Sequence, residues 1–195
     1  MGPVLVMVSC GDPNLTQIVE NPPMVARLVE PDDPELYLAL VAPSPRSRWS
    51  RLLPWRRPAP PPVRYLPLGA GEGRSCDLDR AHLAIHLTLS GMRPGLAGAF
   101  LQSGGSELPG VSVGQGPVRV FTSAEVATIA TTLASLDREL VRTHLAETDL
   151  SDASLPPHVA DKSESTGYVM AYYDELVEFV AAAQTLKLGL VLYLT

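Results

Sequence analysis

Hydrophobic and polar positions change their period several times along the chain, and each change predicts a different kind of element. Val4 to Val8 is a short apolar run that ends before Gly11, and Leu188 to Leu194 is a second such run at the other end. Short apolar runs rich in β-branched residues are typical of buried strands. The sequence therefore predicts one strand near each end of the chain.

Between these runs, apolar residues recur at the three- and four-residue spacing of amphipathic helices. This spacing predicts helices over residues 14–20, 22–29, 32–41, 79–90, 96–101, 122–136, 138–145 and 168–186. Val118 to Phe121 indicates a further strand, and Thr122 with Glu125 fits a capping box at the start of the next helix. Asp12 before Pro13, and either Asp77 or Asp79, are expected to cap helices as well.

A change in composition divides the chain into three parts. Residues 1–42 hold the first strand and the short helices, and residues 74–195 hold the main part of the same domain. Between them, residues 43–73 are predicted to form a flexible insertion or linker. Residues 43–67 of this segment contain eight prolines, six arginines and two tryptophans. Residues 43–68 carry a charge of +6 without any acid, and the rest of the chain therefore carries −12.

Length and overall charge limit the class of protein. A chain of 195 residues with 46% apolar side chains is long enough for one domain with its own core. The net charge of −6 argues against nucleic-acid binding, which needs a basic surface. Cys10 and Cys76 lie far apart and outside any metal-binding spacing, so both are expected to be reduced core residues.

Targeting signals do not change this picture. No basic residue precedes the first apolar run, which is shorter than the core of a signal peptide. No stretch approaches the roughly 18 apolar residues that a membrane span requires. We therefore expect a cytoplasmic protein without a membrane association.

Several stretches resemble the YfbM-like family of bacterial proteins, which is defined as domain of unknown function 1877. They are DLDRAHLAIHLTLSG from Asp77, GQGPVRVFTSAEVATIA from Gly114, and the ending from Tyr168. The resemblance implies a single α+β domain in which several helices pack around a small mixed or antiparallel sheet. It implies no established activity. His82 stands where the family usually has an aromatic residue, and residues 43–73 have no counterpart.

Asp79, His82 and His86 form the most suggestive cluster, because spacings of three and four residues place them on one helix stripe. Such a stripe can hold a metal ion. A simpler interpretation is that Asp79 caps the helix, His82 replaces a packed aromatic residue and His86 bonds to the backbone. We favour the simpler interpretation and expect no metal, no cofactor and no catalytic residue.

Other chemical motifs are weak. No GxSxG sequence or phosphate-binding loop is present. Asp174 and Glu175 are expected to lie on the solvated face of the last helix. Tyr168, Tyr172 and Tyr173 either complete the core or supply binding contacts, and core packing is expected for at least one of them.

These observations favour a non-enzymatic protein-binding module, with an immunity-like or regulatory role and a basic protein as partner. Its candidate binding residues are Asp77, Asp79, His82, His86 and Arg119. The alternative is a small-molecule or metal-dependent enzyme with its site near Asp77, His82 and His86. Nucleic-acid binding through the arginine-rich segment ranks third, and the oligomeric state stays open.

Overall fold

The computed structural model of the chain describes residues 3–41, 62–93, 95–150, 153, 155 and 162–195. The described residues form five strands: β1 (Leu5–Gly11), β2 (Ser75–Asp77), β3 (Ser106–Glu107), β4 (Gln115–Phe121) and β5 (Leu188–Leu194). They also form eight α-helices and one 3₁₀ helix: α1 (Asp12–Glu20), η1 (Pro22–Met24), α2 (Val25–Val29), α3 (Pro34–Val41), α4 (Ala81–Met92), α5 (Leu96–Ala99), α6 (Ser123–Ala134), α7 (Arg138–Glu147) and α8 (Lys162–Thr185).

The strands make a single sheet in the order β2-β1-β5-β4-β3, and every neighbouring pair is antiparallel. β5 lies in the centre, between β1 and β4, so the two predicted end strands are neighbours. The α+β fold class is confirmed, and of the two sheets allowed by the prediction the antiparallel one is present. The apolar β5 is therefore protected from pairing with other chains.

Alternation along the strands gives the sheet two apolar faces. On β5, Leu190 and Leu192 point to one face, and Val191 and Tyr193 point to the other. All four side chains are buried. A sheet that is apolar on both faces has to be covered on both, so the fold needs two helical layers.

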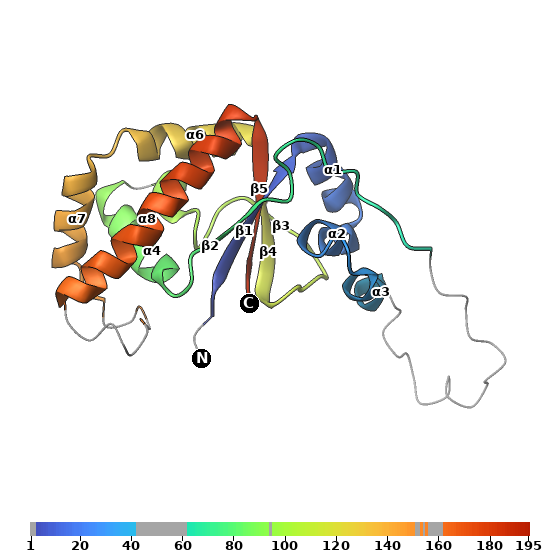
Figure 1. Cartoon of the computed structure of the whole chain (residues 1–195), viewed down its shortest axis with the longest axis horizontal. Coiled ribbons are helices and arrows are strands. Elements are labelled where there is room, and N and C mark those ends of the chain that lie inside the picture. Colours follow the sequence, from blue (N-terminus) through green and yellow to red (C-terminus); the bar gives the residue numbers. More distant parts are fainter. Residues whose placement is uncertain (1–2, 42–61, 94, 151–152, 154, 156–161) are drawn as a thin grey trace, which may run out of the picture.

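Figure 1 shows the sheet seen on edge between these two layers. The larger layer contains α4 to α8 and packs on the face that bears Leu190 and Leu192. The smaller layer contains α1 to α3 and packs on the face that bears Val191 and Tyr193.

Cys10 and Cys76 are buried free thiols, as predicted, and burial raises the pKa of each to about 12.

The start of α6 matches its prediction. The Thr122 hydroxyl accepts a hydrogen bond from the Glu125 backbone N–H, and the Glu125 carboxylate accepts one from the Thr122 backbone N–H. This reciprocal pair is a capping box, which satisfies two N–H groups that the first helical turn leaves free.

Contrary to the prediction, Asp12 does not cap its own helix. Gly11 occupies the N-cap position of α1 without a side-chain cap bond. The Asp12 carboxylate instead accepts hydrogen bonds from the Ser123 backbone N–H at 2.9 Å and the Ser123 hydroxyl at 2.5 Å. The prediction was wrong because a neighbouring helix start, distant in sequence, offers Asp12 two donors at once.

The described end of the proline- and arginine-rich segment, residues 62–73, packs against the sheet. The Glu72 carboxylate accepts hydrogen bonds from the backbone N–H groups of Gly11 and Gly69. It also accepts bonds from the Asn14 side-chain amide, with distances of 2.9 and 3.1 Å from Nδ2 to the two carboxylate oxygens. Residues 42–61 lie outside the described residues, so a flexible insertion at 43–73 stays a prediction.

The length of the helices also bears on membrane association. α8 has 24 residues and is the longest helix that the described residues form. Across the part of the chain that the structure covers, no helix combines the length and the apolar character needed to span a bilayer.

Candidate functional site

The loop between β2 and α4 carries the first two candidate residues. Asp77 is the last residue of β2, and its carboxylate accepts a hydrogen bond of 2.7 Å from the Asp79 backbone N–H. Asp79 has a φ of 43°, in the left-handed region that aspartate tolerates better than most residues. The turn therefore projects both carboxylates from the end of β2.

Neither aspartate caps α4, so that prediction was wrong. Arg80 occupies the N-cap position, and α4 has no side-chain cap bond. The Asp79 carboxylate instead accepts a hydrogen bond of 2.6 Å from the hydroxyl of Tyr168 on α8. A long-range donor has again taken the place of a local one.

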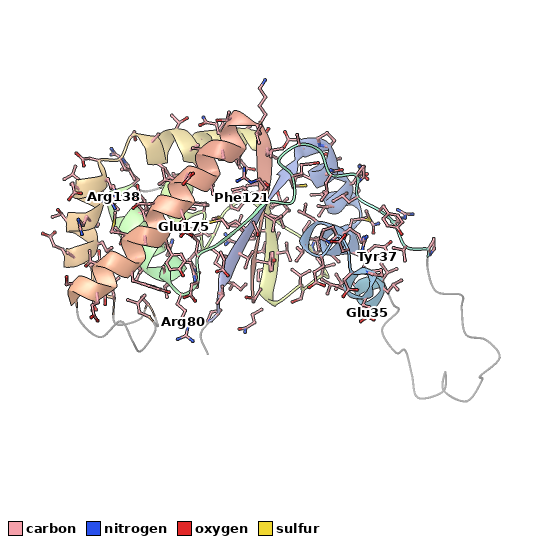
Figure 2. The ribbon with its side chains drawn as sticks, viewed as in Figure 1. Glu35, Tyr37, Arg80, Phe121, Arg138 and Glu175 are labelled. Atoms are coloured by element: carbon pink, nitrogen blue, oxygen red, sulfur yellow. The ribbon has the colours of Figure 1, made fainter. Side chains whose placement is uncertain are left out.

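Tyr168 begins a surface that joins α8 to this loop. Its ring packs edge-on against Tyr172, with centroids 5.0 Å apart and an interplanar angle of 67°. Glu175 follows Tyr172 by about one turn on the same helix, where Figure 2 labels it. We call the group of Asp77, Asp79, Tyr168, Tyr172 and Glu175 the acid–tyrosine surface.

The pKa shifts of the two tyrosines reflect burial and nearby carboxylates: all three carboxylates act on Tyr172, and Asp79 acts on Tyr168. Burial, followed by the charges of Asp79, Glu175 and Asp77, raises the pKa of Tyr172. Burial and the hydrogen bond to the Asp79 carboxylate raise the pKa of Tyr168. Both phenols thus stay protonated near neutral pH, and Tyr168 is a hydrogen-bond donor.

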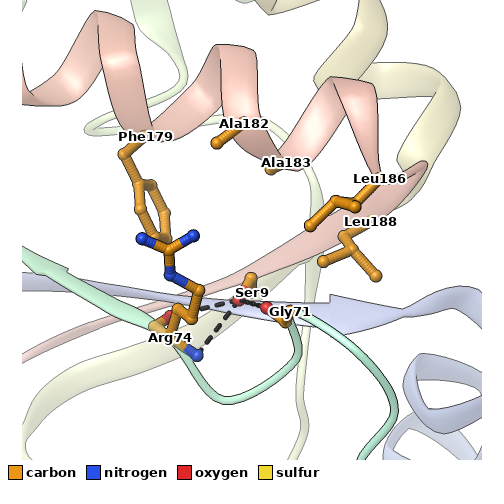
Figure 3. Close-up of a pocket in the computed structure, with 8 residues that line it drawn as sticks. All are labelled: Ser9, Gly71, Arg74, Phe179, Ala182, Ala183, Leu186 and Leu188. Carbon is orange, nitrogen blue, oxygen red and sulfur yellow. Dashed lines mark hydrogen bonds between the residues drawn. The ribbon is translucent and has the colours of Figure 1, made fainter.

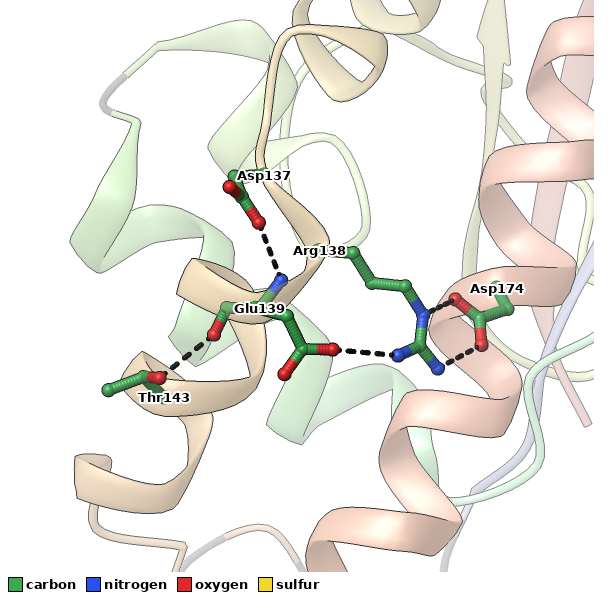
Figure 4. A network of polar contacts seen from close by, with 5 residues as sticks. All are labelled: Asp137, Arg138, Glu139, Thr143 and Asp174. Atoms are coloured by element: carbon green, nitrogen blue, oxygen red, sulfur yellow. Dashed lines mark hydrogen bonds and ion pairs between the residues drawn. The ribbon is translucent and has the colours of Figure 1, made fainter.

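Asp174, the neighbour of Glu175 in sequence, is engaged differently. Its two carboxylate oxygens accept hydrogen bonds of 2.8 and 2.7 Å from Arg138 of α7, as Figure 4 shows. The Arg138 guanidinium also lies 3.4 Å from the Glu139 carboxylate. This bidentate pair joins α7 to α8 and compensates the charge of Asp174. Adjacent acids on α8 therefore differ in their availability.

His82 is buried, and its Nδ1 lies 2.9 Å from the backbone oxygen of Asp79. Desolvation lowers its pKa, although the contacts with Asp79 act in the opposite direction. His82 lies in the first turn of α4, and its neutral imidazole donates a hydrogen bond to the backbone oxygen of Asp79. Such a buried hydrogen bond has a structural role. His82 thus helps to fix the loop that presents Asp77 and Asp79.

His86 lies one turn further along α4 and is half-buried. Its Nδ1 is 3.3 Å from the Ser90 hydroxyl, which donates to the Gly98 backbone oxygen at 2.7 Å. Burial is the main cause of its lowered pKa, and the positive charge of Arg119 contributes. His86 therefore lies on the side of α4 where α5 packs, within range of the charge of Arg119.

Arg119 is buried, and its guanidinium bonds to the backbone. Nη1 and Nη2 donate to the carbonyl oxygens of Phe100 and Leu101 at 2.9 and 2.7 Å. The guanidinium carbon also lies 5.9 Å from the centre of the Phe121 ring. These contacts hold the chain after α5 against β4, and they leave Arg119 little capacity to bind a ligand.

The five candidate residues therefore fall into two groups. Asp77, Asp79 and His82 are joined by hydrogen bonds at the β2–α4 loop, whereas His86 contacts Ser90 and Arg119 bonds to the backbone after α5. In the part of the chain that the structure describes, no three His, Cys, Asp or Glu side chains are placed to hold a metal ion. The stripe of Asp79, His82 and His86 is thus explained by hydrogen bonds within the protein.

Protonation of His82 and His86 is expected to weaken the fold at acidic pH. Both folded pKa values lie below 6.5, so the unfolded chain binds more protons below that pH. The contribution of these two histidines to the free energy of unfolding is fully present above pH 6.5 and is lost as the pH falls below it. Thermal unfolding at about pH 8 and about pH 5.5 measures this decline. His82→Gln/His86→Gln should reduce the decline. An equally steep decline in the double variant would contradict the assignment.

The fold and the surface together define a small α+β protein with a two-sided antiparallel sheet. Among solved structures, a protein of unknown function, YfbM from Escherichia coli, has this fold, with a TM-score of 0.54 and 13% sequence identity. The match covers 98% of this chain and 99% of that one. At this identity the likeness concerns the fold alone.

The family follows from the sequence. The model of a domain of unknown function, DUF1877, matches residues 1–193, and the chain belongs to this family. No curated protein matches the chain significantly. The predicted resemblance is therefore confirmed, and the comparisons assign no activity.

Sequence reasoning missed that Tyr168, Tyr172 and Glu175 lie beside Asp77 and Asp79. Tyr168 is 89 residues from Asp79, and no local spacing predicts their hydrogen bond. The three clustered tyrosines were the available signal. One of them, Tyr173, is buried in the core as predicted, and the other two line the acid–tyrosine surface.

Proposed function

We propose that the chain is a non-enzymatic binding protein that recognises a basic partner protein through its acid–tyrosine surface. The observation that carries this proposal is the convergence of three carboxylates and two packed tyrosine rings from the β2–α4 loop and α8. Among the described residues, the ion pairs join Arg138 to Glu139 and to Asp174. Asp77, Asp79 and Glu175 take part in none of them.

The chemistry of these side chains suits a protein partner. Tyrosine supplies a rigid ring with a polar end, and it is enriched at positions that dominate interface energies. Tyr168 and Tyr172 are both half-buried, so their orientation is set before a partner arrives. Little side-chain entropy then remains to be lost on binding.

The charge of the molecule favours a basic partner. Outside residues 43–68 the chain carries −12, and this charge includes the three carboxylates of the acid–tyrosine surface, which form no ion pair with a described cation. Such a surface accelerates the encounter with a positive protein and discriminates against a negative one. An immunity-like or regulatory protein that captures a basic target is the most concrete form of this role.

Capture from the native host tests the proposal. The wild-type chain is expected to retain a basic protein at low salt and to release it as salt rises. Asp77→Asn/Asp79→Asn/Glu175→Gln should retain at most about one tenth as much, since each exchange keeps the shape and removes one charge. Asp174→Asn is the matched control, because that acid is already paired with Arg138.

Two results would contradict the proposal. One is the absence of any stoichiometric partner of the wild-type chain. The other is a partner that the triple variant retains as well as the wild type does.

A further inference from the structure

The outer edge of β2 is the second feature of this surface. We infer that an extended segment of the basic partner pairs with β2 (Ser75–Asp77) and adds a strand to the sheet. This inference rests on the proposed function and names its mode of recognition. It concerns backbone groups, whereas the proposed function concerns side-chain charges.

The pairing of β1 with β2 determines which backbone groups point outward. Leu78 N–H donates to the Leu5 oxygen, and Ser9 N–H donates to the Arg74 oxygen. In an antiparallel pair, hydrogen-bonded residues alternate with residues whose N–H and C=O point away. With Met7 opposite Cys76, the outward residues of β2 are Ser75 and Asp77.

These outward groups are accessible. Ser75 and Asp77 are exposed, and β2 pairs only with β1 among the described strands. No hydrogen bond between described residues uses the backbone N–H or oxygen of either residue on this side. The edge therefore offers two donors and two acceptors, at the spacing that an added strand requires.

Side chains at the two ends of β2 differ in charge. Beyond Asp77 lies the acid–tyrosine surface. Before Ser75, the exposed Arg74 lies beside a small, largely apolar depression between α8 and the sheet. Figure 3 shows Arg74 on the same side of this depression as Phe179 of α8, with Leu186 further along.

This polarity specifies the partner segment. An added strand that carries lysine or arginine at one end would bring it to Asp79 and Glu175, where the surface has negative charge. Its other end would meet the exposed Arg74, whose positive charge favours an acidic or neutral residue there. The matching segment is an extended peptide that is basic at the end near Asp79 and Glu175 and acidic or neutral at the other.

A second copy of this chain fits the edge less well. Two β2 strands paired antiparallel about their centres would bring together two acid–tyrosine surfaces. They would also bring together two bodies that each carry −12 outside residues 43–68. Like charges across an interface oppose association. Charge complementarity therefore favours a foreign basic segment.

Proline substitution tests the edge selectively. The Ser75 N–H does not bond to β1, so Ser75→Pro removes an outward donor and keeps the existing ladder. Glu107→Pro is the matched control on the opposite edge, because the pairing of Glu107 with Arg119 leaves the N–H of Glu107 outward as well. The probes are short random peptides displayed on phage and selected on the full wild-type chain.

The selected peptides are expected to be basic at one end and to bind Ser75→Pro at least about tenfold more weakly, with Glu107→Pro unchanged. The amides of Ser75 and Asp77 should gain protection from hydrogen exchange in the complex. Failure to select any such peptide, or peptides that bind Ser75→Pro normally, would overturn the inference. A new dimer through β2 would also overturn it.

The two proposals fail separately. If the host partner depends on Asp77, Asp79 and Glu175 but binds Ser75→Pro normally, the added strand is wrong and the binding function stands. If neither set of substitutions changes the binding of the partner, both proposals are wrong.

Discussion

Arg119→Met is expected to destabilise the protein by about 3 kcal/mol, because two buried carbonyl groups would lose their charged donor. The Phe100 and Leu101 oxygens accept hydrogen bonds from Arg119, and no other backbone bond between described residues ends on them. Methionine fills much of the same volume but cannot donate. Chemical denaturation of the wild type and the variant measures the difference.

Arg119→Lys is the matched variant for this prediction. It retains the charge, but a single ammonium group cannot reproduce the planar fork that serves both oxygens. An intermediate loss of about 1 to 2 kcal/mol is therefore expected. A loss below about 0.5 kcal/mol for Arg119→Met would contradict the structural role and restore Arg119 as a binding candidate.

Glu72→Gln is expected to cost about 2 to 4 kcal/mol, because the amide that replaces the carboxylate adds a donor where three donors already converge. The donors are the backbone N–H groups of Gly11 and Gly69 and the side-chain amide of Asn14. Two of them would lose their acceptor or face an opposing N–H group. Chemical denaturation measures the cost.

Glu20→Gln provides the control for Glu72, since it makes the same chemical change at an exposed position of α1. Its expected cost is within about 0.5 kcal/mol. If Glu72→Gln were equally mild, the segment at 62–73 would not be anchored through its carboxylate. Proteolysis within that segment should then be as fast in the wild type as in the variant.

The parts of the fold that sequence could predict are those with local causes. The strand at Leu188 to Leu194 was predicted at its observed bounds, because an apolar run that only Gly189 interrupts has no solvated face. The capping box of Thr122 and Glu125 was equally readable, since both of its hydrogen bonds lie within one turn.

The wrong predictions concern carboxylates whose partners lie far away in sequence. Asp12 and Asp79 both stand near helix starts, where local bonding favours a cap. In the folded chain, Ser123 and Tyr168 provide donors that local reasoning does not include. Such pairs depend on how the layers pack, which no spacing along the sequence encodes.

The candidate binding residues were chosen by the same local reasoning. Asp77 is exposed at the end of β2, and Asp79 is half-buried beside it. His82, however, bonds to the backbone of its own loop, and Arg119 bonds to the backbone after α5. A polar residue in an apolar stretch of sequence is a candidate for a binding or a structural role. Its burial and its hydrogen-bond partners decide between the two roles.

The central claim is that the carboxylates of Asp77, Asp79 and Glu175 bind a basic protein. Calorimetric titration of the captured partner into the wild-type chain and the triple variant, at low and high salt, tests it most directly. We predict at least about tenfold weaker binding by the variant, together with a smaller salt dependence. Equal affinity and equal salt dependence for both proteins would contradict the claim.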